Sequence, residues 1–343
     1  MALILGLESS CDDSAAALVT SDRVILAQAV VGQDEAHRPF GGVVPEIAAR
    51  AHVERLPDLI RQVFAEADLK PSDLDAVAAT AGPGLIGGVM VALLAGKGLA
   101  LATGKPLVAV NHLEGHALSP RLADPDLAFP YLLLLASGGH CQLLEVRGVG
   151  DYRRLATTID DAAGEAFDKS AKLLGLAYPG GPAIEALARE GDPHAVPFPR
   201  PLLGRAEPHF SFAGLKSAVQ RATVSGKHRP ADIAASFQQA VVDCLVDRTA
   251  RALAISNAPT LVVAGGVAAN LAVRSALADL AQQKRRAFSV PPGWLCTDNA
   301  AMIGWAGAER FAVGLTDPLD APARARWPLD ENADKVRGAG VKA

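Results

Sequence analysis

Residues 3–19 read Leu-Ile-Leu-Gly-Leu-Glu-Ser-Ser-Cys-Asp-Asp-Ser-Ala-Ala-Ala-Leu-Val, and this stretch decides the fold class. A short apolar run is followed by a polar turn from Glu8 to Ser14, after which an apolar run returns. The pattern predicts a strand, a turn and a second strand. Small hydroxyl residues and exposed N–H groups in such a turn are suited to hold an anion.

The same pattern returns in the second half of the chain. Tyr131 to Leu135 predicts a buried strand, residues 136–140 a polar turn, and Gln142 to Val146 an antiparallel strand. Helical patterns alternate with these and further strands, so the chain is predicted to be α/β. The duplicated openings predict two similar lobes that face each other across a central cleft, where strand ends and glycine turns hold ligands.

The predicted domain boundaries follow from this duplication. We expect a first lobe from residues 1–115 together with about 298–320, and a second lobe from 116–297 with an inserted loop region at about 190–230. The polar, proline-containing tail at 321–343 is predicted to be loosely ordered.

Composition and charge exclude several classes of protein. The net charge is −4, which argues against a protein that grips nucleic acid by charge alone. No apolar run in the sequence reaches the roughly 18 uninterrupted residues that span a bilayer, so no membrane association is expected. The first residues read as a strand rather than a signal peptide. Four cysteines without a CxxC pair indicate a reducing, cytoplasmic setting.

A candidate metal site lies in His112-Leu113-Glu114-Gly115-His116. Histidines four apart on a helix lie about 40° from one another, so both can reach one ion. Zinc proteases place a glutamate directly after the first histidine, whereas Glu114 falls at about 200°, on the far side. Asp298 is the best third ligand, although taken alone it is better explained as the cap of the helix that follows it. Two histidines and a carboxylate fit iron(II) or zinc and leave positions open.

Glycine-rich turns after strands indicate a nucleotide-binding site. Ser137-Gly138-Gly139 allows backbone N–H groups to approach phosphate oxygens, and Gly265-Gly266 allows an equally close approach. Either turn is also explained as a tight turn alone. Residues 82–87 match GxGxxG, but no acid follows at the distance that a dinucleotide-binding fold requires. Asp168 is a candidate to accept hydrogen bonds from a ribose, or to pair with a neighbouring lysine.

Taken in order, the motifs resemble one family. They are Glu8-Ser-Ser-Cys-Asp-Asp-Ser14, Ala81-Gly-Pro-Gly84, Asn111-His-Leu-Glu-Gly-His116, Ser137-Gly-Gly-His140, Ala166-Phe-Asp-Lys169, Tyr178-Pro-Gly-Gly-Pro182, Phe210-Ser-Phe-Ala-Gly-Leu-Lys216, Gly265-Gly-Val-Ala-Ala-Asn270 and Cys296-Thr-Asp-Asn-Ala300. The chain is similar, over roughly residues 3–315, to the bacterial-type tRNA threonylcarbamoyladenosine transferases, once described as O-sialoglycoprotein endopeptidases. Small departures at Ala177, Cys141 and Ala213 touch no inferred ligand.

The resemblance implies the fold, the reaction and the partners. It implies two actin-like (ribonuclease H-like) lobes of the ASKHA superfamily, the sugar-kinase-like ATPases. Threonylcarbamoyl would pass from threonylcarbamoyladenylate to the N6 amine of adenosine 37 in tRNAs that read ANN codons, and AMP would leave. Partners implied are tRNA, a metal-free paralogue that forms a heterodimer, and a small P-loop ATPase.

The resemblance also implies site residues. His112, His116 and Asp298 would bind the metal, iron in the family's usual assignment. ATP, ADP or the adenylate would be held by Leu135, Ala136, Ser137, Gly138, Gly139, Asp168, Gly181, Glu185 and Asn270. The residue that takes the proton from the amine is not identified, and Asp12 and Asp13 are candidates only. A small-molecule kinase of the same superfamily is the main alternative function, and a metalloendopeptidase is disfavoured.

Overall fold

The computed structural model describes residues 1–40, 42–334 and 336. It divides into two compact units, the first formed by Met1–Leu127 with Thr297–Glu331 and the second by Ala128–Cys296 with the chain from Asn332. The predicted boundary at residue 115 falls inside a helix, and the structure keeps that whole helix in the first unit. The return of the chain to the first unit at Thr297 lies one residue from the predicted 298.

The first unit is built on a five-stranded sheet with the order β3-β2-β1-β4-β5. β1, β2 and β3 are antiparallel, whereas β4 and β5 run parallel to β1. Every residue of β1, β2, β4 and β5 is buried, which agrees with a sheet covered by helices. The strands are β1 Leu3–Glu8, β2 Ser14–Thr20, β3 Ile25–Val31, β4 Ala76–Gly82 and β5 Leu107–Asn111; the helices are α1 Asp34–His37, η1 Arg38–Phe40, α2 Pro45–Ala67, η2 Pro71–Asp73, α3 Ile86–Thr103, α4 His112–Ala123 and α11 Ala300–Ala312.

The second unit repeats this topology. Its sheet has the order β10-β9-β6-β7-β8, in which β6, β7 and β8 form an antiparallel meander while β9 and β10 run parallel to β6. The duplication predicted from the two strand-turn-strand stretches is therefore present at the level of whole sheets. The strands are β6 Tyr131–Ala136, β7 Cys141–Gly148, β8 Asp151–Thr157, β9 Thr260–Ala264 and β10 Ala287–Ser289; the helices are α5 Ala163–Leu173, α6 Gly180–Ala188, α7 Ala213–Ser225, α8 Pro230–Ile255, η3 Gly266–Ala269, α9 Leu271–Gln283 and α10 Gly293–Cys296.

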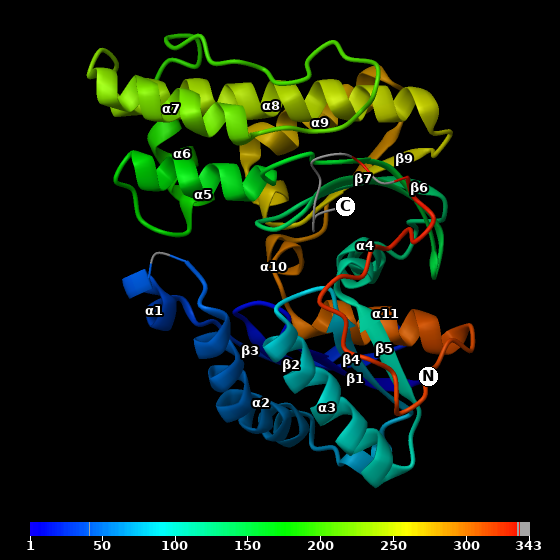
Figure 1. Cartoon of the computed structure of the whole chain (residues 1–343). Helices are drawn as coiled ribbons and strands as arrows, with labels where there is room; N and C mark the ends of the chain where they lie inside the picture. Colours follow the sequence, from blue (N-terminus) through cyan, green and yellow to red (C-terminus); the bar gives the residue numbers. More distant parts are fainter. Residues whose placement is uncertain (41, 335, 337–343) are drawn as a thin grey trace. The chain divides into compact units, whose positions relative to one another are not determined.

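Helix α11 packs directly on the first sheet, against β1, β2 and β4 (Figure 1). Glycines make this close approach possible, because a Cβ on Gly6 would collide with the backbone of Gly304 and a Cβ on Gly307 with Ala78. The last helix of the unit thereby contacts its first strand, and the residues just before α11 lie at the sheet.

Helix α3 is the one helix, among the residues that the structure describes, that is long and apolar enough to cross a membrane by length and composition, with a mean hydropathy of 1.7. It packs on β4 and beside α2, and its buried face includes Val89, Leu93 and Ala100. Only 33% of the helix is buried, so one face packs on the sheet and the opposite face is exposed. Helix α2 continues through Pro57 as a single helix of 23 residues.

Two predicted irregular regions are more ordered than expected. The region 190–230 contains helix α7 and the start of α8. The early part of the tail is hydrogen-bonded to the first unit, since Lys97 donates to the carbonyl of Ala321 and the backbone N–H of Arg324 to that of Ala81. Residues 335 and 337–343 of the predicted tail lie outside the described residues.

Candidate functional site

The three predicted metal ligands meet in the first unit. Strand β5 ends at Asn111, whose side-chain oxygen accepts a hydrogen bond from the N–H of Leu113 at 2.9 Å and so caps α4. The helix then begins at His112, and His116 follows one turn later on the same face. The Nε2 atoms of these histidines lie 3.5 Å and 3.1 Å from the same oxygen, Oδ1 of Asp298.

These separations fit a metal ion. Bonds of roughly 2.1 Å place neighbouring ligand atoms about 3.0 Å apart in octahedral geometry and about 3.4 Å apart in tetrahedral geometry. The three ligand atoms all lie within 4.8 Å of one another. Both histidines are buried, whereas the side chain of Asp298 is 26% exposed, so the open side of the group lies at the aspartate. Two imidazoles and one carboxylate are a donor set for iron(II) or zinc.

Asp298 does not cap the helix that follows it. The cap of α11 is Asn299, whose side-chain oxygen accepts a hydrogen bond from the N–H of Met302 at 2.9 Å. The helix-capping role that the sequence offered for Asp298 is therefore filled by Asn299. The Asp298 carboxylate points instead at the two histidines.

A buried glutamate holds the other side of His112. Nδ1 of His112 lies 3.0 Å from Oε2 of Glu8 and 3.1 Å from the hydroxyl of Ser10. Burial opposes a proton on this imidazole, but the carboxylates of Glu8 and Asp298 outweigh burial and raise the pKa of His112 to about 9. In the absence of a metal, the two carboxylates thus stabilise a positive charge on the imidazole of His112. A bound cation would supply this positive charge instead.

Asp12 and Asp13 lie in the turn that follows β1. Burial, with repulsion from Asp298, raises the pKa of both carboxyl groups, and that of Asp13 reaches about 7. The turn therefore lies close enough to Asp298 for the charges to interact. A cation bound at Asp298 would oppose this repulsion and lower both pKa values.

The predicted nucleotide residues belong to the second unit, where the Ser137 turn and Gly265-Gly266 follow the carboxyl ends of the parallel strands β6 and β9. The Ser137 turn is closed by the N–H of Ser137, which donates to the carbonyl of His140 at 2.8 Å. A Cβ on Gly138 or Gly139 would meet nothing within 4 Å, so both glycines border open space. Gly265, in contrast, has a φ of +89° and no room for a Cβ beside the carbonyl of Ala136.

The polar members of this group are tied to helix starts. Asp168 on α5 accepts a hydrogen bond from the N–H of Gly180, the first residue of α6, at 2.8 Å. Glu185 on α6 accepts one from the N–H of Leu271 at 2.9 Å, and the side chain of Asn270 caps α9. A Cβ on Gly181 would also meet open space. Each of the four residues thus lies at, or is hydrogen-bonded to, the start of α6 or α9.

Comparison with known proteins decides the family. A model of the tRNA N6-adenosine threonylcarbamoyltransferases matches residues 24–305. The chain belongs to this family. It is 73% identical over 344 residues to the threonylcarbamoyltransferase of Sphingopyxis alaskensis and 68% identical over 350 residues to that of Novosphingobium aromaticivorans, with 100% of each chain covered in both cases.

Solved structures with low identity share the fold of this threonylcarbamoyltransferase family member. Component A of (R)-2-hydroxyglutaryl-CoA dehydratase from Acidaminococcus fermentans has a TM-score of 0.54 at 16% identity and covers 91% of this chain and 100% of its own. Full-length HypF in its phosphate- and nucleotide-bound form has a TM-score of 0.61 at 13% identity, covering 91% of this chain and 46% of its own. The predicted α/β fold with two actin-like units is confirmed.

In this threonylcarbamoyltransferase family member Glu114 is directed away from the candidate metal ligands His112 and His116. Its Oε2 accepts a hydrogen bond from Arg310 on α11 at 3.1 Å, and the side chain is buried. A water held at His112 and His116 would therefore have no base in Glu114. The geometry removes the feature that a metalloendopeptidase would need.

Some features of the two sites were not foreseen from the sequence. Glu8 was placed in the opening turn, but nothing local indicated that it meets His112, which lies 104 residues further along the chain. Gln238 on α8 accepts a hydrogen bond from the amide of Asn270 at 2.8 Å. Leu135 and Ala136 are buried strand residues, so their side chains are not exposed to a ligand.

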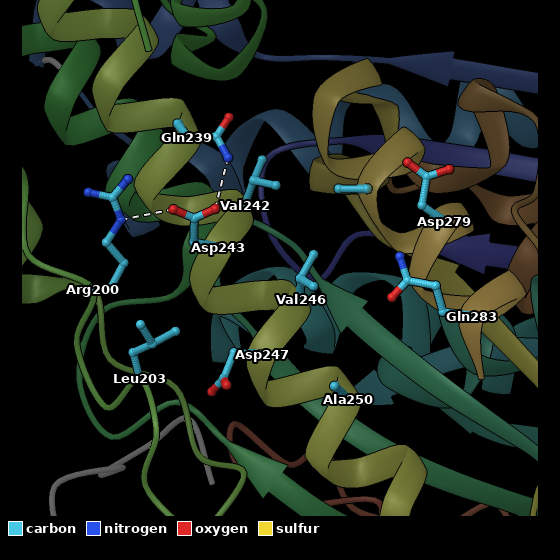
Figure 2. A pocket seen from close by; sticks show the side chains of 11 residues that line it. Arg200, Leu203, Gln239, Val242, Asp243, Val246, Asp247, Ala250, Asp279 and Gln283 are labelled. Carbon is cyan, nitrogen blue, oxygen red and sulfur yellow. Dashed lines mark hydrogen bonds and ion pairs between the residues drawn. The ribbon is translucent and has the colours of Figure 1, made fainter. Parts of the chain in front are cut away.

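A groove of about 610 Å³ lies elsewhere in the second unit, between α8, α9 and the segment around Arg200 (Figure 2). Asp243 on its wall accepts hydrogen bonds from Arg200 at 2.9 Å and Gln239 at 2.8 Å. None of the predicted site residues lines this groove. Its position does not associate it with either candidate site.

Proposed function

We propose that this protein transfers a threonylcarbamoyl group from threonylcarbamoyladenylate to the N6 amine of adenosine 37 in tRNAs that read ANN codons. The amine nitrogen forms a bond with the carbamoyl carbon, and the bond from that carbon to the phosphate oxygen breaks. The amine loses one proton and AMP leaves. Membership of the family carries the reaction class, and the convergence of His112, His116 and Asp298 supports its dependence on a metal.

The metal would be held by these three side chains, with iron(II) expected and zinc as the alternative. When bound, such an ion supplies a positive charge that polarises a carbonyl or stabilises a phosphate leaving group. The chain's own residues orient the ligands: Asn111 starts α4, Asn299 starts α11, and Glu8 supports His112.

The donor nucleotide would be bound by residues of the second unit. Backbone N–H groups of the Ser137 turn have open space at Gly138 and Gly139 and are suited to a phosphate. Such fixed dipoles stabilise the negative charge that the leaving AMP takes on. Asp168 and Asn270 already hold α6 and α9 in place, and we propose that they also border the nucleoside.

Asp13 is the proposed acceptor of the proton from the amine. In the metal-free chain burial and the neighbouring carboxylates raise its pKa to about 7, and burial, the largest of these causes, still raises the pKa toward neutral pH when a cation offsets the repulsion from Asp298. The amine of adenosine is a weak nucleophile, so positioning of the two substrates contributes more than the strength of the base. Asp12 is the alternative acceptor in the same turn.

The proposed partners are tRNA, a metal-free paralogue and a small P-loop ATPase. Support for a protein partner comes from the outer face of α3, where Ile86, Met90 and Leu94 recur every fourth residue and are 48%, 45% and 57% exposed. The four cysteines are free, which agrees with the proposed cytoplasmic setting.

The test is in vitro modification of an unmodified tRNA transcript. The purified chain and its partners are incubated with threonine, bicarbonate and ATP, and the digested nucleosides are analysed by mass spectrometry. Threonylcarbamoyladenosine should appear only when this chain is present. His112→Ala should abolish the product, while circular dichroism should show an intact fold. His194→Ala, which replaces an exposed histidine remote in sequence, should leave product formation unchanged. Full product formation by His112→Ala would refute the metal site's role.

A further inference from the structure

Glu8 is a completely buried carboxylate at the end of β1, in a strand whose other residues are apolar. A buried carboxylate is strongly unfavourable unless hydrogen bonds and an opposite charge compensate for the loss of water. A glutamine or a leucine would be less costly in the same sheet. The placement of a carboxylate here therefore needs an explanation beyond packing.

Three donors surround this carboxylate. Oε1 accepts a hydrogen bond from the N–H of Ser10 at 2.5 Å, and Oε2 accepts one from the hydroxyl of Thr80 at 2.6 Å. Oε2 also lies 3.0 Å from Nδ1 of His112. The carboxylate is thus fixed on both oxygens, and its one remaining partner is the imidazole that faces Asp298.

The contact decides which nitrogen of His112 is available. A proton on Nδ1 is donated to Glu8, so the lone pair of a neutral imidazole lies on Nε2, the atom directed at Asp298. A carboxylate behind a histidine also makes the opposite nitrogen a stronger ligand. No lysine or arginine among the described residues forms an ion pair with Glu8.

The charges of the centre are then balanced by a divalent cation. Glu8 and Asp298 each carry one negative charge, and neutral His112 and His116 add none. The cation would cancel both carboxylates, one by direct contact and one through the imidazole. This accounts for the burial of Glu8.

We propose that Glu8 is a positioning residue of the metal centre, which orients His112 and strengthens its bond to a divalent cation. The inference rests on the proposed metal site and adds a residue outside the ligand set. Outer partners of this kind typically change metal affinity by about 10-fold to 100-fold.

The experiment measures metal binding rather than catalysis. The metal-free full-length chain is titrated with cobalt(II), whose visible absorption reports ligand geometry, and the dissociation constant is obtained by competition with a chelator. Glu8→Gln keeps an acceptor but removes the charge, and we expect an increase in Kd of about 10-fold with a changed absorption band. Glu8→Ala should increase Kd by about 100-fold.

Two controls make the outcome decisive. Asp75→Asn alters a carboxylate near the other end of β1, where it accepts a hydrogen bond from the N–H of Leu3, and should leave Kd unchanged. His112→Ala removes a ligand and should abolish tight binding. A wild-type Kd and spectrum for both Glu8 variants, with binding lost in His112→Ala, would overturn the proposal while the metal site stands. Unchanged binding in His112→Ala would instead overturn the metal site itself.

A milder substitution keeps the proposal testable if the Glu8 variants fail to fold. Thr80→Val removes one hydrogen-bond donor to Glu8. Glu8 keeps its charge, and valine keeps the shape of the threonine side chain. A several-fold increase in Kd with an unchanged melting temperature of the metal-free protein supports the proposal. An unchanged Kd in Thr80→Val would count against it.

Discussion

The side-chain amide of Asn111 donates a hydrogen bond to the carbonyl of Trp327 at 2.9 Å, across 216 residues of sequence. The same side chain caps α4, the helix that carries both candidate histidine ligands. One residue therefore connects the segment after α11 to the start of the helix that carries His112 and His116. The ring of Trp327 is in turn covered by the guanidinium of Arg324, 4.7 Å from its centre.

Asn111→Ala should lower the free energy of unfolding of the first unit by roughly 1–2 kcal/mol, because it removes a helix cap and the link to Trp327. Urea denaturation followed by the fluorescence of the tryptophans measures this. Asn257→Ala, an exposed asparagine in the second unit, should change stability by less than about 0.5 kcal/mol. Equal stabilities of the two variants would show that the link contributes little.

Two glycines beside the Ser137 turn should respond differently to the same substitution. A Cβ on Gly164 would lie 2.6 Å from the carbonyl oxygen of Ser137, so Gly164→Ala should destabilise the second unit by roughly 1–3 kcal/mol. Gly138→Ala meets open space and should alter stability by less than about 0.5 kcal/mol. If the turn binds phosphate, Gly138→Ala should nevertheless weaken AMP binding measured by calorimetry. Unchanged AMP affinity would argue against the phosphate role of this turn.

The carboxyl of Asp13 should make the metal-free protein less stable as the pH rises. Burial and the neighbouring carboxylates raise its pKa from 3.8 to about 7, so the folded protein retains a proton that the unfolded chain has lost between these values. Stability is lost across that window as the pH increases. Asp13→Asn should therefore be more stable than the wild type above pH 7, by roughly 2 kcal/mol after screening by water, with no gain below about pH 4. Thermal melts at several pH values test this, and a constant difference would contradict it.

His52 should make the protein sensitive to acid. Its Nδ1 lies 2.7 Å from the hydroxyl of Ser14 and its Nε2 3.1 Å from the carbonyl of Cys11, while burial lowers the pKa of the imidazole. The unfolded chain then binds a proton more readily, so stability falls as the pH drops through about 6.5.

The comparison that isolates this effect is the difference in unfolding free energy between pH 7.5 and pH 5.5. It should be smaller in His52→Gln than in the wild type, while His194→Ala, whose imidazole is exposed, should keep the wild-type difference. The same pH difference in all three proteins would show that His52 binds a proton equally readily in the folded and the unfolded chain.

Local patterns in the sequence were sufficient for much of the fold. The alternation of apolar runs and polar turns near residues 3–19 and 131–146 predicted two similar sheets, because strand burial is a property of neighbouring residues. The spacing of His112 and His116 predicted a shared ligand face for the same reason, since the helical repeat is local.

What the chain could not reveal by itself was which distant residues meet. That Asp298 rather than Asn299 faces the histidines depends on how α11 packs against β1 through Gly6 and Gly304. That Glu8 supports His112 depends on the order of β1, β4 and β5 in the sheet. The sequence determined the ligand pair, the polar turns and the repeated strands, because each follows from residues within a few positions. The third ligand, the buried carboxylate behind His112 and the glycines that border open space were decided only by the tertiary structure, because they depend on contacts between segments more than 100 residues apart or on the space left around them.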